Sequence, residues 1–363
     1  MALPVESAWP VVAPETQLIE LVSGVDALYL SGRGGLSTAM QLELEAGRQE
    51  AEEAEGPVPF EFGGVEFGIE PRSMGRYRFS LVHPNAQIGV TLSEKLPTLR
   101  VQVRSEFLHA VGPRAALAWC EGVGGQALGE MSWGLSRLDL FCDVQGWDLE
   151  GDDRHRFVCQ ARTLVTHEDN DDLTGFQFGR RTTGTIMARL YDKTIDVSRT
   201  GKDWWLDIWG DRYDPALPVL RVEFELGRAG LGEFGIDHPT EGLDRIGGLW
   251  ATLTEWLSYR IPGDDQTKSR WKVAPEWHAI QHATLRGEAI GLERIRAGKG
   301  AGSLRLITPA LVGYLARFAS IIGTDDLDST LGALRWVVRT DEGRRGIQFS
   351  ERIASLVRQD RFR

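Results

Sequence analysis

One strand-like segment occurs twice in this chain, and the repeat limits how the chain can fold. LPTLRVQVRS occupies 96–105 and LPVLRVEFEL occupies 217–226. A second related pair precedes them, VDALYL at 25–30 and LDLFCD at 138–143. Two segments repeated in the same order indicate two copies of one supersecondary unit that share a core. The copies differ at one point that matters, because only the second carries two acidic residues, Glu223 and Glu225.

The apolar pattern predicts the same order of elements in both halves, which span about 15–125 and 130–262. Each half reads as strand, helix, hairpin, strand, helix, and the first helix of each half is expected at 36–55 and 153–167. The expected fold class is therefore α+β. We expect the halves to form one curved, continuous antiparallel sheet backed by helices. Together they make up a first domain, residues 1–262.

The segment 263–363 differs from the rest in both pattern and charge. Its periodicity is helical, and TPALVGYLARFASIIG has clear helix ends, with Thr308 at the N-cap and Gly323 at the stop. From residue 261 onward, 17 lysines and arginines face 12 acidic residues, whereas the preceding part holds 24 basic and 40 acidic residues. We expect a helical bundle or a winged-helix-like module that binds DNA or mediates dimerisation. A helical surface that is merely rich in arginine would give the same charge.

The bulk properties exclude several classes of protein. A net charge of −11 argues against nonspecific coating of nucleic acid. We see no secretory signal and no apolar run long enough to span a bilayer. Three cysteines without paired spacing are typical of free thiols in a reducing compartment. The expected location is the cytoplasm, without a membrane partner.

Four carboxylates are expected on one face of two strands: Asp139, Asp143, Glu223 and Glu225. Carboxylates placed so close together resist joint ionisation unless a cation intervenes. A cluster of oxygen ligands suits Mg²⁺ or Mn²⁺. The alternative is that these carboxylates pair with Arg137 and Arg221 on a solvated sheet face.

The strand ARLYDK places a tyrosine between two cations. Arg189, Tyr191 and Lys193 alternate, so they share one face of a strand. A phenol so placed suits attack on a phosphodiester, since the cations favour the phenolate and neutralise the phosphoryl oxygens. Arg180 and Arg181 lie at the adjoining turn and could hold backbone phosphates. The alternative is an ordinary half-buried tyrosine with its hydroxyl in water.

Three segments, taken in order, resemble a known family. SRLDLFCD, FQFGRRTTGTIMARLYDK and PVLRVEFEL are similar to segments of the replication initiation factor family, the Rep-trans type of rolling-circle initiators and relaxases. The resemblance covers roughly residues 20–260, and the C-terminal helices look like those of actinobacterial members. It implies a dimeric protein that melts an origin on a plasmid, phage or integrative element and nicks one DNA strand. A host helicase is a further partner that it implies.

The resemblance also implies roles for individual residues. Tyr191 would be the nucleophile that stays linked to the 5′ end, and Arg189 and Lys193 would bind phosphate. The implied ligands of a divalent metal, Mg²⁺ or Mn²⁺, are Asp139, Glu223, Glu225 and, in a looser part of the pattern, Asp143.

Several alternatives remain open at this point. Tyr213, in a tryptophan-rich insertion, could be the nucleophile instead of Tyr191. The tryptophans of 201–210 could stack on unpaired bases, or they could close a core or a dimer contact. The chain could also be a catalytically silent DNA-binding or replication-control protein on the same scaffold. An unrelated metal-dependent hydrolase could use the same acids.

Overall fold

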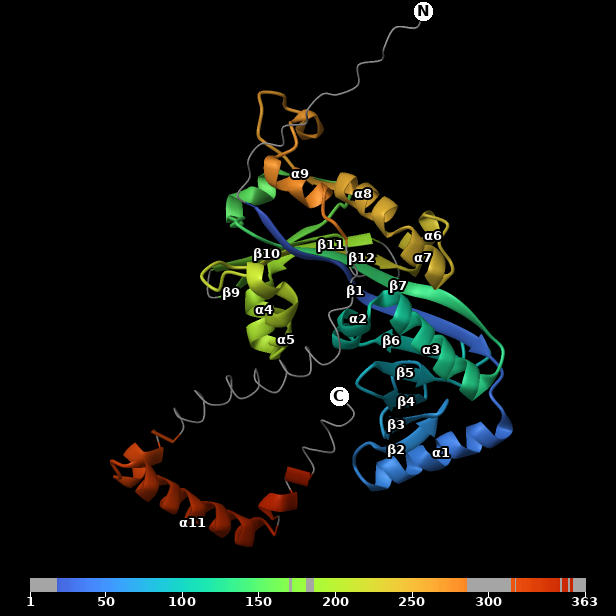
Figure 1. Cartoon of the computed structure of the whole chain (residues 1–363), viewed down its shortest axis with the longest axis vertical. Helices are drawn as coiled ribbons and strands as arrows, with labels where there is room; N and C mark the ends of the chain where they lie inside the picture. Colours follow the sequence, from blue (N-terminus) through green and yellow to red (C-terminus); the bar gives the residue numbers. More distant parts are fainter. Residues whose placement is uncertain are drawn as a thin grey trace, which may run out of the picture.

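The computed structural model describes residues 18–169, 172–180, 186–285, 315–316, 318–346, 348–351 and 353–354. Its centre is an eleven-stranded antiparallel sheet with helices against it (Figure 1). The strands, from one edge to the other, are β2 (Val58–Phe62), β3 (Val65–Glu70), β4 (Phe79–Val82), β5 (Ala86–Val90), β6 (Leu99–Val103), β1 (Ile19–Gly34), β7 (Met131–Gln145), β12 (Leu220–Gly227), β11 (Ile186–Asp192), β10 (Asp172–Phe178) and β9 (Leu164–Asp169). The α+β class and the large helix-backed sheet are confirmed.

The strand order is symmetric about the β1–β7 pair. Outward from β1 come β6, β5 and β4, and outward from β7 come β12, β11 and β10. The repeated segments therefore occupy equivalent places, since β6 is to β1 what β12 is to β7. β1 and β7 pair along nearly their whole lengths, from Ile19 opposite Gln145 to Gly34 opposite Met131. This long pairing joins the two halves into one sheet.

Helices cover the sheet on both faces: α1 (Thr38–Glu53), α2 (Ser105–Val111), α3 (Pro113–Leu128), α4 (Lys193–Thr200), α5 (Trp204–Trp209), α6 (Arg228–Glu233), α7 (Pro239–Asp244), α8 (Ile246–Trp256) and α9 (Pro275–Gln281). The main core forms because strand residues alternate in direction. Val222, Phe224 and Leu226 point into it, and the Phe224 ring meets Trp250 edge-on with ring centres 5.4 Å apart. The intervening residues of β12 are left for the opposite face.

The helix predicted at 153–167 is wrong. The segment forms a 3₁₀ turn η1 (Gly151–His155), the short strand β8 (Phe157–Cys159) and β9. β8 pairs with β13 (Leu257–Tyr259), and the Tyr259 hydroxyl donates to Asp153 at 2.5 Å. The β-branched residues Val158, Val165 and Thr166 favour strands, and this preference together with the strand pairing outweighs the helical periodicity.

Residues just past 262 pack with the sheet rather than apart from it. Trp277 and Ile280 of α9 are fully buried in the main core, and the Trp277 indole donates to the Thr254 carbonyl at 2.9 Å. The 3₁₀ turn η3 (Lys268–Arg270) precedes α9. The proposed division of the chain at 262 into two domains stays a prediction.

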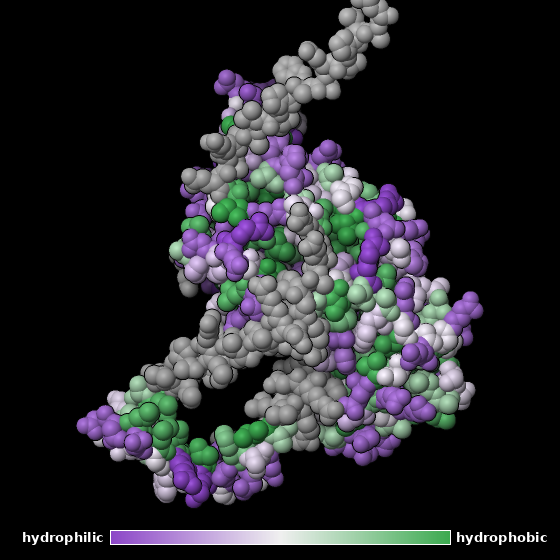
Figure 2. All heavy atoms as spheres, in the orientation of Figure 1, coloured by the Kyte–Doolittle hydropathy of each residue, from purple (hydrophilic) through white to green (hydrophobic). Residues whose placement is uncertain are grey.

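The described C-terminal residues are helical, as expected. The helix α11 (Leu327–Arg345) is capped by Asp326, whose side chain accepts from the Ser329 amide at 2.9 Å. Half of the predicted helix at 308–323, residues 308–314 and 317, lies outside the described residues, and residues 315–316 and 318–322 are helical. Several large apolar side chains here are exposed, including Trp336 at 70% (Figure 2). Roles of this region in DNA binding or dimerisation stay predictions.

Among the described residues, no helix combines the length and the apolar character that crossing a bilayer requires. The three cysteines carry free thiols, as expected from their spacing.

Candidate active site

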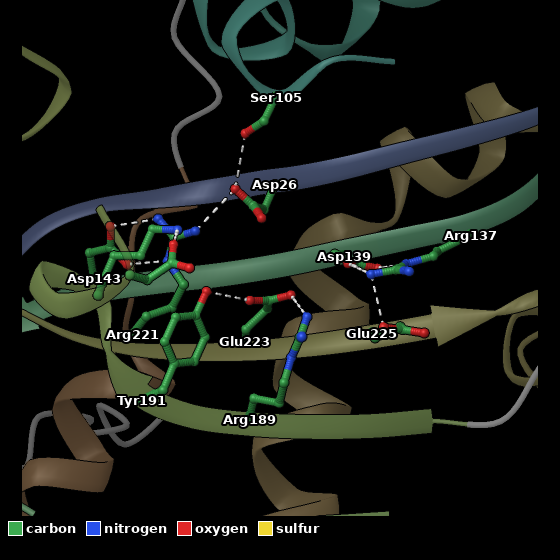
Figure 3. Close-up of polar contacts among 12 residues, drawn as sticks. Asp26, Ser105, Arg137, Asp139, Asp143, Arg189, Tyr191, Arg221, Glu223 and Glu225 are labelled. Atoms are coloured by element: carbon green, nitrogen blue, oxygen red, sulfur yellow. Dashed lines mark hydrogen bonds and ion pairs between the residues drawn. The ribbon is translucent and has the colours of Figure 1, made fainter. Parts of the chain in front are cut away.

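The predicted acidic residues are brought onto one face of the sheet by strand register. Glu225 lies opposite Asp139 across β7–β12, and Glu223 lies opposite Arg189 across β11–β12. These pairings confirm that the two acidic strands are neighbours. The four carboxylates on this face are buried, however, and helices α4 and α5 and their connections cover part of the face. Figure 3 shows the resulting polar side chains spread along the sheet in three groups.

The first group contains Arg137, Asp139 and Glu225. The Arg137 guanidinium donates to Asp139 from Nε at 2.8 Å, and its Nη2 lies 2.8 Å from Glu225 Oε2. Asp139 is 1% exposed, and burial raises its pKa to about 8. The carboxylates of Glu223 and Glu225 act in the same direction, against the hydrogen bonds from Arg137. The cluster therefore holds more negative charge than one guanidinium neutralises.

The second group is a buried ion pair between Arg221 and Asp143, both fully shielded from solvent. Arg221 makes two hydrogen bonds to the Asp143 carboxylate, at 2.6 and 2.7 Å. The Trp209 indole donates to Asp143 Oδ2 at 2.8 Å. Arg221 and Trp209 therefore engage both oxygens of Asp143. Figure 3 shows Asp143 apart from two of the other predicted metal ligands, Asp139 and Glu225.

Asp26 completes the second group and is the residue that sequence reasoning missed. Its Oδ1 lies 3.0 Å from Arg221 Nη1 and 3.5 Å from His109 Nε2. Although burial raises the pKa of Asp26, Arg221 and His109 outweigh it and hold that pKa well below its usual value. The strand pairing is irregular between Val25 and Ala27, which places Asp26 at a β-bulge. The repeat contained the signal, since VDALYL aligns Asp26 with Asp139.

The third group surrounds Tyr191. The Tyr191 hydroxyl donates to Glu223 Oε2 at 2.9 Å, while Arg189 pairs with the other oxygen of Glu223. Burial and the Glu223 charge raise the pKa of Tyr191 well above its usual value. The alternative of a tyrosine with its hydroxyl in water does not describe this geometry. Glu223 is placed to accept the phenol proton.

Lys193 lies near Tyr191 but belongs to helix α4 and not, as expected, to the strand of Tyr191. The strand ends at Asp192, whose side chain caps α4 by accepting from the Ile195 amide, and Lys193 is the first residue of that helix. Its Nζ still lies 5.7 Å from the centre of the Tyr191 ring. Burial lowers the pKa of Lys193, and the nearby Arg221 charge adds to this effect. The expected trio of Arg189, Tyr191 and Lys193 is therefore assembled.

These side chains line a cleft of about 520 Å³. Arg189, Tyr191, Lys193 and Glu223 come from the second half of the chain. The first half contributes the opposite side, which includes Tyr29, Arg104 and Ser105. A cleft that holds a phenol, a carboxylate and cations can bind a phosphodiester and move a proton beside it.

The tryptophan-rich insertion closes a core. Trp204, Trp205 and Trp209 are each at most 4% exposed and pack with Phe141 in a second apolar cluster. The Arg221 guanidinium lies 4.1 Å from the centre of the Trp205 ring, so this cluster shields the buried ion pair. The core alternative is thus confirmed for this segment. Tyr213 packs on Trp209 with ring centres 5.0 Å apart and does not line the Tyr191 cleft.

Of the two arginines predicted to contact DNA, Arg180 does not line the cleft. Gly175 pairs with Tyr191 and Phe178 pairs with Ala188, so Arg180 lies past the end of the hairpin that is remote from Tyr191. Arg180 is exposed. Arg181 lies outside the described residues.

The carboxylates predicted to bind a metal form ion pairs with arginines. Arg137 occupies the position between Asp139 and Glu225 that a shared cation would take. Within the described ranges, no group of three or more histidine, cysteine, aspartate or glutamate side chains is arranged to hold a metal ion. The donor chemistry suits a divalent cation, since buried carboxylates raise the Asp139 pKa, but Arg137 would have to leave first.

This chain has little similarity to known proteins. No family model matches the chain, and no curated protein matches it. Among solved structures, the rolling circle replication initiator protein from Geobacillus stearothermophilus is similar at 17% identity and a TM-score of 0.42. The match covers 73% of this chain and 98% of that one. Similarity at this level assigns neither a family nor an activity to the chain.

Proposed function

We propose that the protein nicks one strand of DNA through Tyr191 and thereby initiates rolling-circle replication or element transfer. The observation that carries this proposal is the Tyr191 hydroxyl, held 2.9 Å from Glu223 in a cleft that Arg189 and Lys193 also line. The sequence resemblance to rolling-circle initiators supports the same reaction.

The proposed step uses the three side chains around the tyrosine. The Tyr191 oxygen attacks the phosphorus, Glu223 accepts the phenol proton, and the bond to the 3′ oxygen breaks. Lys193 can donate a proton to that oxygen, because burial lowers the pKa of its ammonium group. Arg189 neutralises charge on the phosphoryl oxygens. The products are a free 3′ hydroxyl and a 5′ phosphate linked to Tyr191.

A divalent ion, Mg²⁺ or Mn²⁺, belongs to this proposal as a cofactor. Asp139, Glu223 and Glu225 would hold it once Arg137 and Arg189 move aside, and it would neutralise phosphoryl charge. Asp143 is left out of this set because Arg221 and Trp209 occupy it.

Metal affinity is expected to rise with pH. Asp139, with a pKa of about 8, must lose its proton to bind a cation, so protons compete with the metal below pH 8. Between pH 6 and 8 the Mn²⁺ affinity should increase by up to roughly 50-fold, which calorimetric titration can measure. Asp139→Asn should remove most of this dependence. A pH-independent affinity, or no binding at either pH, would contradict the metal assignment.

The nicking proposal is tested by incubating the protein with Mn²⁺ and supercoiled or single-stranded DNA that carries the origin of its own element. We expect a nicked product and a covalent protein–DNA adduct that survives denaturing electrophoresis. Binding to the origin without nicking would favour a second function, a catalytically silent DNA-binding or replication-control protein. The ion pairs that already neutralise the acidic residues favour this second function.

The same proposal includes further partners. We propose a homodimer that acts in the cytoplasm on an origin of a plasmid, phage or integrative element, with a host helicase unwinding the nicked DNA. Light scattering coupled to size-exclusion chromatography tests the dimer.

A further inference from the structure

A second, larger groove lies on the same face of the sheet, and residues from both halves of the chain line it. Its volume is about 1010 Å³, and five arginines but only two carboxylates line it. Both carboxylates are already paired, Glu225 with Arg137 and Asp237 with Arg228. The groove is thus a basic surface on a chain whose net charge is −11.

Three of these arginines have no acidic partner in the part of the chain that the structure describes: Arg33, Arg76 and Arg100. Arg33 and Arg76 are exposed, and Arg100 is half-buried. Burial raises the pKa of the Tyr77 phenol, and the positive charges of all three arginines lower it. All three arginines also line the one groove together with Tyr77, so they can contact phosphates of the same strand.

The position of Arg76 depends on a turn that folds over the sheet. Met74 and Tyr77 form an isolated bridge at this turn, and Tyr77 lies directly over Gly89 of β5. A Cβ on Gly89 would come within 2.8 Å of the Tyr77 Cβ. Gly89 lies opposite Arg100 in the register of β5 and β6. Glycine at this position thus lets the turn deliver Arg76 beside Arg100.

The repeat explains why this surface is basic. Arg100 is the counterpart of Arg221, but the residue equivalent to Asp143 in the first copy is Leu30. The counterparts of Glu223 and Glu225 are Gln102 and Arg104. The first copy thus keeps the arginine but has no counterpart of Asp143, the carboxylate that forms the buried pair with Arg221 in the second copy.

We propose that this arginine groove, defined by Arg33, Arg76 and Arg100, binds the phosphates of a single DNA strand and leads that strand to Tyr191. The inference rests on the proposed function for the direction of the strand. Tyr29 and Arg137 line both the groove and the Tyr191 cleft, so the two spaces adjoin. Half-buried Tyr29 and Trp133 offer aromatic surface to unpaired bases, which a duplex would keep stacked inside.

The experiment measures binding in a protein that cannot nick. In the Tyr191→Phe background, fluorescence anisotropy follows a labelled DNA single strand of about 16 nucleotides across a range of salt concentrations. Adding Arg76→Gln and Arg100→Gln should weaken binding about tenfold. The slope of log affinity against log salt should become shallower by about 1.4, since each phosphate contact on a single strand contributes about 0.7.

The matched control removes the same charge elsewhere. Arg72 and Arg162 are exposed and line neither the groove nor the cleft, so Arg72→Gln with Arg162→Gln should leave affinity and slope nearly unchanged. Equal losses in both double variants, tighter binding of the matching duplex, or no binding at all would overturn the groove. If the groove variants alone lose binding while the wild-type protein never nicks DNA, that result would support DNA binding by the groove and reject the nicking reaction.

Discussion

Replacing Tyr191 with phenylalanine is expected to abolish the covalent adduct and to slow nicking by roughly 10⁴-fold or more. The substitution removes only the attacking oxygen, and the ring continues to fill its place beside Lys193. Glu223 loses one hydrogen-bond donor but keeps Arg189, so the site should stay folded. Single-turnover assays on a single-stranded origin, resolved by denaturing electrophoresis, measure both the adduct and the rate.

The matched control is Tyr213→Phe. Tyr213 was the competing nucleophile, and its ring packs on Trp209 away from the cleft. This variant should nick at the wild-type rate. An adduct that persists in Tyr191→Phe but disappears in Tyr213→Phe would move the chemistry to the insertion. Glu223→Gln adds a graded test, because loss of a general base typically costs 10²- to 10⁴-fold in rate.

The substitution expected to cost the most stability is Arg221→Met. It would leave Asp143 and Asp26 buried without a cation, and breaking a buried pair in this way costs about 3–5 kcal/mol of unfolding free energy. Methionine retains much of the volume between Phe141 and Trp205 that the arginine side chain fills. Urea denaturation followed by circular dichroism measures the change.

Arg199→Met provides the control for this substitution. Arg199 pairs with Asp169 at the surface, where both side chains are about half exposed, so its loss should cost less than about 1 kcal/mol. Equal effects of the two substitutions would show that burial of the Arg221 pair does not matter.

Acid should reveal the same ion pair. The pKa of Asp26 is held below its ordinary value of 3.8 in the folded protein, so the unfolded chain binds the proton more tightly. The stability that Asp26 contributes is therefore present above about pH 4 and is lost as the pH falls through the lower, folded pKa. In Arg221→Met this loss should shrink, because the cation that lowers the pKa is gone.

Most predictions about the site follow from the alternation of side chains along a strand. Residues two apart share a face, so RVEFEL predicts that Glu223 and Glu225 lie together and that Phe224 packs on the other side. The repeat suggested the symmetric sheet, because equivalent strands need equivalent neighbours. These regularities depend on local geometry, which sequence encodes directly.

What sequence reasoning missed depends on contacts between distant segments. The bulge that turns Asp26 toward Arg221 is a local irregularity that alternation cannot reveal. The pairing of Arg137 with Asp139 and Glu225 was noted only as an alternative to a metal, and side-chain placement was needed to show it. At 157–159 a strand replaces part of the predicted helix, and its partner β13 lies about a hundred residues away in the sequence.

The β1–β7 pairing has a consequence for the history of the chain. Two equivalent strands that pair antiparallel about a local twofold axis make the contact expected when two identical subunits join through their sheet edges. A short link between the halves, from α3 to β7, converts such an isologous dimer into one polypeptide. Fusion releases the two subunits from identity, so each ancestral site can change alone. In this chain the second copy carries Glu223 and Glu225 where the first carries Gln102 and Arg104.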